Sequence, residues 1–107
     1  MIGGNVIARL QKKGESATNA IGERIPTWVD THQLLGWLDL TAGDSKYTYQ
    51  TKLQESTHVF ICDYDSTVER NAEDKRLIVN GLTYNVLLID NPMELNKQLE
   101  IYLKFVG

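Results

Sequence analysis

The chain has 107 residues, the size of one domain, so we expect a single unit over residues 1–107. Hydrophobic residues make up 42% of the chain and charged residues 23%, which favours a folded domain over a disordered one. The net charge of −3 argues against a general affinity for polyanions, because nonspecific nucleic-acid binding needs a basic face. One cysteine excludes an internal disulfide and is typical of a reducing compartment, and no apolar run approaches the roughly 20 residues that span a bilayer. Composition does not say what the protein does.

The first part of the chain predicts strands on either side of a polar loop. The segment Asn5 to Gln11 alternates apolar and polar residues with a period of two, which indicates a first strand. The segment Lys12 to Gly22 is rich in Gly, Ser, Thr and Asn and predicts a long flexible loop. Arg24 to Leu40 indicates one long strand or two in succession, in which Gly36 permits a bend or a close backbone approach. The predicted core face of this stretch consists of Leu34, Gly36, Leu38 and Leu40.

The segment Thr41 to Ser56 is the longest predicted connection. It has about 16 residues, which is unusual in a compact domain unless a loop is functional or carries structure of its own. Asp44 or Ser45 is a suitable N-cap for a short helix that ends near Leu53. Whether the segment is a solvated crossover or a functional loop is left open by its residues.

Four strands are predicted in the second half of the chain. Thr57 to Tyr64 places His58, Phe60, Cys62 and Tyr64 on one side, and a polar excursion follows from Ser66 to Asp74. The next two strands run from Lys75 to Val79 and from Leu82 to Ile89. Asn80-Gly81 between them is the strongest short hairpin signal, because a type I′ turn needs positive φ at both central residues.

A final strand, Leu99 to Val106, has the most regular alternation in the sequence, with Leu99, Ile101, Leu103 and Phe105 in one apolar row. Strands at short spacing with almost no helical periodicity predict an all-β domain. We expect a small antiparallel β-barrel of about six strands, or a sandwich, with a long loop (which has room for a short helix) between strands two and three.

One acidic motif is a candidate for catalysis. Asp63-Tyr64-Asp65-Ser66-Thr67 follows an apolar strand and spells D-x-D-x-T, the arrangement of haloacid-dehalogenase-type phosphotransferases, in which two carboxylates leave one strand end together. Those enzymes need a parallel α/β sheet, whereas the residues that follow here indicate a β-hairpin and a strand. We therefore interpret Asp63 and Asp65 as turn residues that accept backbone hydrogen bonds, and we predict no enzymatic activity and no catalytic residues.

Metal and cofactor sites are not predicted either. A calcium loop starting at Asp63 would have Val68 where the sharp turn needs glycine. The two histidines, His32 and His58, are 26 residues apart and lack companions at ligand spacing, so we expect His58 to be a hydrogen-bonded core residue. Cys62 is expected to be a small buried hydrophobe.

Several aromatic residues are candidates for contacts outside the core. Trp37 alternates with the predicted core row, so both faces of its strand are apolar, which favours a partner surface. Because no basic stripe accompanies the rings, protein partners are favoured over single-stranded nucleic acid. The candidate interface residues are Trp28, Trp37 and Tyr102.

The order of these features resembles the head-completion, or head–tail joining, proteins of long-tailed bacteriophages, also called head-closure or stopper proteins. The resemblance runs from about Asn5 to Val106. It comprises the first strand and its Gly-containing loop, and its more specific elements follow in order: Thr27-Trp28, Gly36 before Leu38, the polar insertion before Thr57-His58, the hairpin Arg76 to Val86, and Asp90-Asn91-Pro92 before the last strand. The acidic segment Cys62 to Asp65 departs from the family, in which relatives tend to carry Arg between apolar positions.

The resemblance implies a structural, non-enzymatic subunit of a virion or prophage. Such subunits form a homo-oligomeric, dodecameric ring that docks beneath the portal and adaptor proteins after DNA packaging, closes the channel and offers a platform to tail proteins. Packaged DNA would pass through this ring without sequence-specific binding, and the ring would assemble in the bacterial host cytoplasm. The resemblance also implies that the long connection closes the channel, through Tyr47, Thr48, Tyr49, Gln50, Thr51, Lys52, Leu53 and Gln54.

Two other functions are kept as alternatives to a head–tail connector. One is a neighbouring tail-completion or minor capsid protein with a similar barrel. The other is a small β-barrel that binds nucleic acid through its aromatic residues.

Overall fold

The computed structural model describes residues 2–40 and 56–107, and all statements on structure below refer to these residues. They form eight β-strands and one short 3-10 helix, and none of their helices is long and apolar enough to cross a membrane. The elements are β1 (Val6–Lys13), β2 (Ala17–Thr18), β3 (Arg24–Ile25), β4 (Trp28–Leu40), β5 (His58–Asp63), β6 (Lys75–Val79), β7 (Leu82–Asp90), η1 (Pro92–Glu94) and β8 (Gln98–Phe105).

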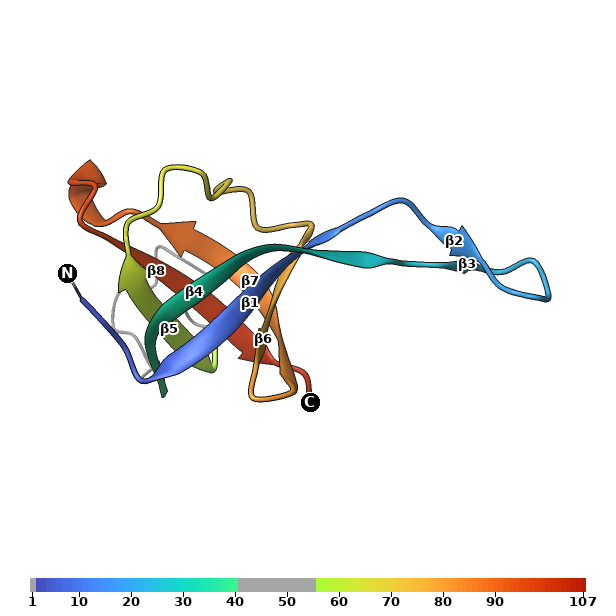
Figure 1. Cartoon of the computed structure of the whole chain (residues 1–107), viewed down its shortest axis with the longest axis horizontal. Helices are drawn as coiled ribbons and strands as arrows, with labels where there is room; N and C mark the ends of the chain where they lie inside the picture. The colour runs from blue at the N-terminus through green and yellow to red at the C-terminus, as the bar shows by residue number, and fades with distance from the viewer. Residues whose placement is uncertain (1, 41–55) are drawn as a thin grey trace.

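Six of these strands close into an antiparallel barrel in the order β1-β4-β5-β8-β7-β6, and β6 pairs back onto β1 (Figure 1). Closure removes the free sheet edges that would otherwise invite pairing with other chains. The predicted all-β class and the six-strand barrel are confirmed. The long connection lies where the sequence predicts it, between β4 and β5, the second and third strands of the barrel along the chain.

The core is the interior of the barrel, and it is filled by the alternating apolar residues of each strand. Leu10, Phe60 and Ile101 are among the side chains with no exposed surface. The predicted inward rows are confirmed in the middle of the strands but are wrong at two ends, since Leu40 is 71% exposed and Phe105 is 45% exposed. Both residues lie at the rim, where the last pair of a strand extends beyond the enclosed interior.

The β6–β7 hairpin has the conformation that the Asn-Gly pair predicts. Asn80 has φ 52° and Gly81 has φ 79°, and Val79 and Leu82 are the last paired residues on either side. Positive φ at both central positions defines a type I′ turn, whose twist matches that of the flanking strands. The turn therefore fixes the register of β6 and β7.

β4 and its neighbours approach each other closely at Gly36. A Cβ atom added there would lie 2.3 Å from the Ile61 carbonyl oxygen and 2.6 Å from Cζ of Phe60. On the opposite side, the Asn5 amide donates to the Gly36 carbonyl at 3.0 Å. The predicted close backbone approach at Gly36 is thus confirmed, and only glycine fits the space.

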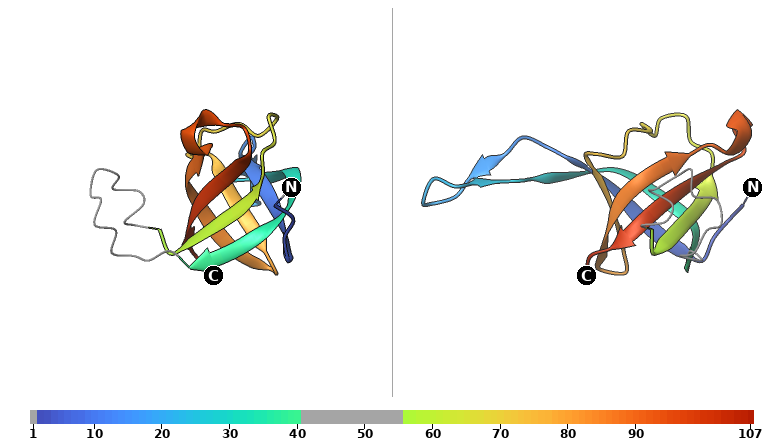
Figure 2. Two further views of the ribbon diagram at one scale, coloured as in Figure 1. Left: turned by 90° about the vertical axis from the view of Figure 1, so that its left-hand side faces the viewer. Right: turned by 180° about the vertical axis from the view of Figure 1, so that it is seen from behind.

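The predicted flexible loop over Lys12 to Gly22 is wrong for most of its length. Lys12 and Lys13 extend β1, and the chain then forms a two-stranded arm over residues 14–27, in which β2 pairs with β3. Because β1 and β4 pair up to Lys13 and Trp28, the arm continues their ribbon away from the barrel, as Figures 1 and 2 show. The backbone pairing of β2 with β3 and the turn between them give the segment a regular structure, although its polar composition had indicated a loop.

The excursion between β5 and β6 contains no strand, as predicted, and it is fastened to the barrel by a buried lysine. The Lys75 side chain is 3% exposed, and its Nζ donates to the Asn71 carbonyl at 2.8 Å and to Asp74 Oδ1 at 3.1 Å. Val68 and Ala72 pack into the core cluster from the same excursion. The segment therefore forms a fixed cover over one end of the barrel.

Candidate functional site

An apolar surface, which we call the outer patch, lies on the outside of the barrel and consists of Ile7, Leu35, Trp37 and Ile61. Ile7 pairs with Leu35, and Trp37 pairs with Ile61, so the four residues lie side by side on β1, β4 and β5. Ile7 is 61% exposed, Leu35 52% and Trp37 46%. Contiguous exposed apolar residues of this kind mark interaction surfaces more often than isolated ones do.

The structure separates the three aromatic residues that the sequence singled out. Trp37 and Tyr102 both face outward, since the residues before and after each of them point inward. Their strands β4 and β8 both pair with β5, where Val59 is the partner of Asp39 on one side and of Tyr102 on the other. Trp28 lies nine residues before Trp37 on the same strand, which corresponds to about 30 Å of extended chain. Trp28 therefore belongs to a different part of the surface.

Trp28 is covered by a polar network of its own molecule. The Arg76 guanidinium lies 4.4 Å from the centre of the indole ring, and Arg76 Nε donates to Gln11 Oε1 at 2.6 Å. Gln11 in turn donates to Asp30 at 2.6 Å. This bond and the hydrogen bond from Arg9 lower the pKa of Asp30. These contacts connect β4, β1 and β6 on the outer face, so they stabilise the base of the arm.

Tyr102 is half-buried beside acidic side chains. Its hydroxyl donates to Glu100 Oε1 at 3.2 Å, and burial together with the Glu100 charge raises the pKa of Tyr102 to about 12. The phenol stays protonated over the whole physiological pH range. It is a hydrogen-bond donor at the edge of the outer patch.

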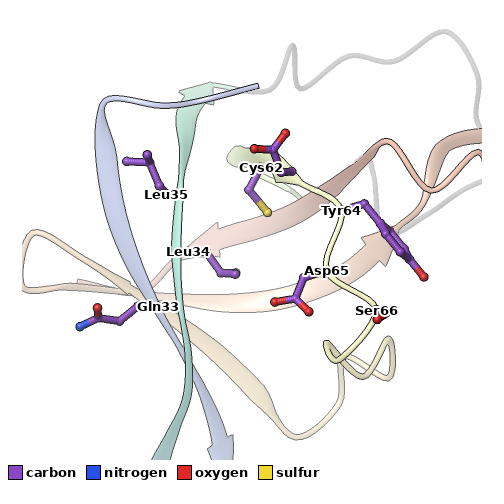
Figure 3. Close-up of a pocket in the computed structure, with 8 residues that line it drawn as sticks. Gln33, Leu34, Leu35, Cys62, Tyr64, Asp65 and Ser66 are labelled. Atoms are coloured by element: carbon purple, nitrogen blue, oxygen red, sulfur yellow. The ribbon is translucent and has the colours of Figure 1, made fainter. Parts of the chain in front are cut away.

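A cleft of about 420 Å³ opens where β4 and β5 diverge beyond the Gly36–Cys62 pair. Figure 3 shows that Leu34, the Cys62 thiol and Asp65 point into this space, whereas Gln33 and the Tyr64 ring point away. We call it the β4–β5 cleft, and its lining residues are Gln33, Leu34, Leu35, Cys62, Asp63, Tyr64, Asp65 and Ser66. The cleft has an apolar floor and an acidic rim without lysine or arginine.

The carboxylates of the D-x-D-x-T motif at this rim are held by hydrogen bonds, as the sequence predicted for turn residues. Asp63 accepts from the Ile2 amide at 2.6 Å, and Asp65 accepts from the hydroxyl of Thr67 at 2.6 Å and from its amide at 2.9 Å. The bonds from Thr67 lower the pKa of Asp65. Together with the antiparallel sheet, this geometry favours the structural interpretation of the motif over the phosphotransferase.

A histidine bridges β4 to the excursion next to the cleft. His32 Nε2 lies 2.9 Å from Thr67 Oγ1, and Nδ1 lies 2.9 Å from Thr31 Oγ1. The two hydroxyls in turn donate to Asp65 and to the Leu10 carbonyl. This bridge holds the excursion against β4.

The predicted roles of His58 and Cys62 are confirmed in part. Cys62 is buried, as expected of a small hydrophobic residue, and desolvation raises the pKa of its thiol to about 11. His58 is only half-buried at the rim, where its ring packs edge-on against Tyr84 at 5.0 Å and its Nδ1 lies 2.8 Å from Thr57 Oγ1. Over residues 2–40 and 56–107, no three His, Cys, Asp or Glu side chains gather as metal ligands would.

The residues assigned to channel closure, Tyr47 to Gln54, lie outside the described residues. The ends of the connection are described, however: Leu40 pairs with His58, so the connection leaves and re-enters the barrel at adjacent strand ends. Ser56, two residues before β5 begins, is buried.

The comparisons with known proteins identify the family. Residues 5–104 match the phage head completion protein family. The chain belongs to this family. Among curated proteins, none matches the sequence. The fold is similar to the solution structure of protein SF1141 from Shigella flexneri 2a, with a TM-score of 0.68 and 18% sequence identity over 100% of this chain and 96% of that one.

Membership of the phage head completion proteins confirms the family that the sequence suggested, and it makes this chain a structural protein of the phage particle. Sequence reasoning missed two surfaces, the arm and the β4–β5 cleft. The arm had a signal in Asn19 and Gly22, which are spaced as in a tight turn between short stretches that include Ala17 and Ile25. The cleft had none, because it depends on where two strands separate.

Proposed function

We propose that this head completion protein is one subunit of a dodecameric ring at the head–tail connector. The ring docks on the portal and adaptor proteins after DNA packaging, closes the channel and presents the surface to which tail proteins bind. Family membership over residues 5–104 carries the proposal. The outer patch of Ile7, Leu35, Trp37 and Ile61 supports it, because a barrel of this size buries its core without that surface and leaves it for a partner.

The charge of the chain fits a channel subunit that surrounds DNA without binding it tightly. The net charge is −3, and among the described residues four basic side chains form ion pairs with carboxylates: Arg9, Lys12, Arg70 and Lys75. Tight phosphate contacts would slow the passage of DNA during ejection. We therefore place DNA in the channel as cargo and not as a ligand.

The proposal is tested by locating the subunit in the particle. A small epitope tag is placed after Gly107, and purified particles are examined by electron microscopy with a tag-specific antibody fragment. Label at the junction of head and tail, below the portal, supports the proposal. Label at the far end of the tail or over the capsid surface contradicts it and favours a tail-completion or minor capsid protein.

The nucleic-acid alternative is tested separately with the purified chain. Binding to single-stranded DNA that falls with rising salt and is lost in Trp37→Ala would favour it. Met93→Ala is the control, since Met93 is 87% exposed and distant in sequence from the outer patch. We expect no measurable binding for any of the three proteins.

A further inference from the structure

The arm presents an apolar side chain at its tip, in a turn that is held by hydrogen bonds. The Asn19 side chain accepts from the amides of Ile21 and Glu23 at 3.1 and 2.9 Å, and the Asn19 amide donates to the Glu23 carbonyl at 2.9 Å. Gly22 has φ 86°, which completes the turn. Ile21 is nevertheless 78% exposed.

The arm buries nothing that would explain its shape. All four residues of β2 and β3 are exposed, and the arm is held by local hydrogen bonds, such as those from Gly14 to the Thr27 carbonyl and from the Thr27 hydroxyl to the Glu15 carbonyl. A two-stranded ribbon alone is only marginally stable in water. Ile21, together with Ile25 at 45% exposure, therefore provides an apolar surface suited to a partner.

The β4–β5 cleft has the complementary properties. Its volume of about 420 Å³ exceeds what one isoleucine side chain needs, and Leu34 and Cys62 form an apolar floor. Asp63 and Asp65 make the rim acidic. On the arm, Arg24 is exposed and has no ion-pair partner among the described residues.

The arm does not reach the cleft of its own molecule. Gln33 at the cleft and Ile25 on the arm are eight residues apart, or about 25 Å of extended strand, and the tip lies farther out. Figure 1 shows the arm directed away from the barrel, whose β1–β4 ribbon it continues. The cleft and the arm tip therefore do not contact each other within one molecule.

We propose that Ile21 at the arm tip of one copy inserts into the β4–β5 cleft of a second copy, with Arg24 facing the acidic rim. This is a head-to-tail contact, in which each copy uses its arm on one side and its cleft on the other. Repetition of such a contact closes into a ring when the rotation between copies divides a full turn. The inference rests on the proposed function only in assuming that copies lie side by side in the particle.

Disulfide trapping tests the contact directly. In a Cys62→Ala background, Ile21→Cys is combined with Ser66→Cys, because Ser66 lines the cleft. A mild oxidant is then added to two samples, the purified chain at high concentration and the assembled particles. A disulfide forms only when the two Cα atoms come within about 7 Å. The matched control combines Met93→Cys with Ser66→Cys, because Met93 is as exposed as Ile21 but lies on η1.

We expect a ladder of linked copies in particles, with at least tenfold more linked chain than in the control. In a mixture of the two single variants, Ile21→Cys and Ser66→Cys, we expect mixed dimers and no longer species. A chain present in particles without linkage at residue 21, or linked through it to a different protein, would overturn the inference and leave the proposed function standing. A chain absent from particles would overturn the proposed function. In that case the purified chain tests the contact: a ladder of linked copies supports it, and the absence of a ladder overturns it.

Discussion

Substitution of Gly36 by alanine is expected to destabilise the barrel strongly. The new Cβ would lie 2.3 Å from the Ile61 carbonyl oxygen, and this contact must lengthen by about 0.7 Å to reach 3.0 Å, below which real Cβ contacts are essentially never found. The obstructing atom belongs to the backbone of the paired strand β5, so it moves only if the β4–β5 pairing is distorted. Overpacking typically costs about 1 to 3 kcal/mol, and a clash with backbone is expected to cost about 3 kcal/mol or more; each kcal/mol lowers the Tm of a domain this size by roughly 4 °C or more.

Thermal unfolding followed by circular dichroism measures this effect. We expect the Tm of Gly36→Ala to fall by about 12 °C or more. Gly14→Ala is the control, because its Cβ would meet mainly the side chains of Thr27 and Val29, at 3.0 and 3.4 Å, and its cost is expected to stay below about 1 kcal/mol. Equal Tm values for Gly36→Ala and the wild type would refute the claim that this approach requires glycine.

Three further outcomes are expected. The pKa of Asp65 is lowered by its hydrogen bonds from Thr67, so Asp65 stabilises the fold above pH 3.8, and this contribution is lost as the pH falls through the lowered folded-state pKa. Asp65→Asn should therefore flatten the acid side of a curve of Tm against pH. Glu73→Gln should not, because Glu73 has no side-chain hydrogen bond in the described structure. The Cys62 thiol, buried and with its pKa raised to about 11, should react with a thiol reagent at pH 8 more than 100-fold more slowly than in denatured protein, and rapid labelling of the folded chain would contradict its packing role. Removal of Tyr47 to Gln54 should leave the circular dichroism of the barrel unchanged while particles lose packaged DNA, as nuclease sensitivity measures; full DNA retention would refute the closing role, which follows from the family resemblance.

The fold was predictable because the apolar rows and the main turn agree with each other along the chain. The Asn80-Gly81 pair defines a hairpin through its dihedral preferences, and the alternation from Leu99 onward places Leu99, Ile101 and Leu103 in the interior, where all three are buried. Where a row continues past the barrel, as at Phe105, the pattern overestimates burial. Periodicity reports which face a residue is on but not where the enclosed volume ends.

The interaction surfaces were predictable only in part. Trp37 was identified because it alternates with a core row, and it is exposed as expected. Trp28 was identified as an aromatic of the same kind, yet Arg76 covers its ring, which depends on a register across three strands that a sequence does not display. The first half of the arm was missed because its pairing is local and most of its residues are polar, whereas β3 falls in the stretch from Arg24 to Leu40 that was predicted as one strand or two.

The central claim, that this chain completes the phage head at the connector, is tested most directly by removing it from the particle. Heads assembled in cells that lack the chain are purified, their DNA content and nuclease sensitivity are measured, and purified chain is then added back with tails. The account predicts that heads without the chain package DNA, lose it during purification and do not bind tails. Added chain should restore tail joining on those heads that still contain DNA. Stable, tailed and infectious particles formed without the chain would contradict it.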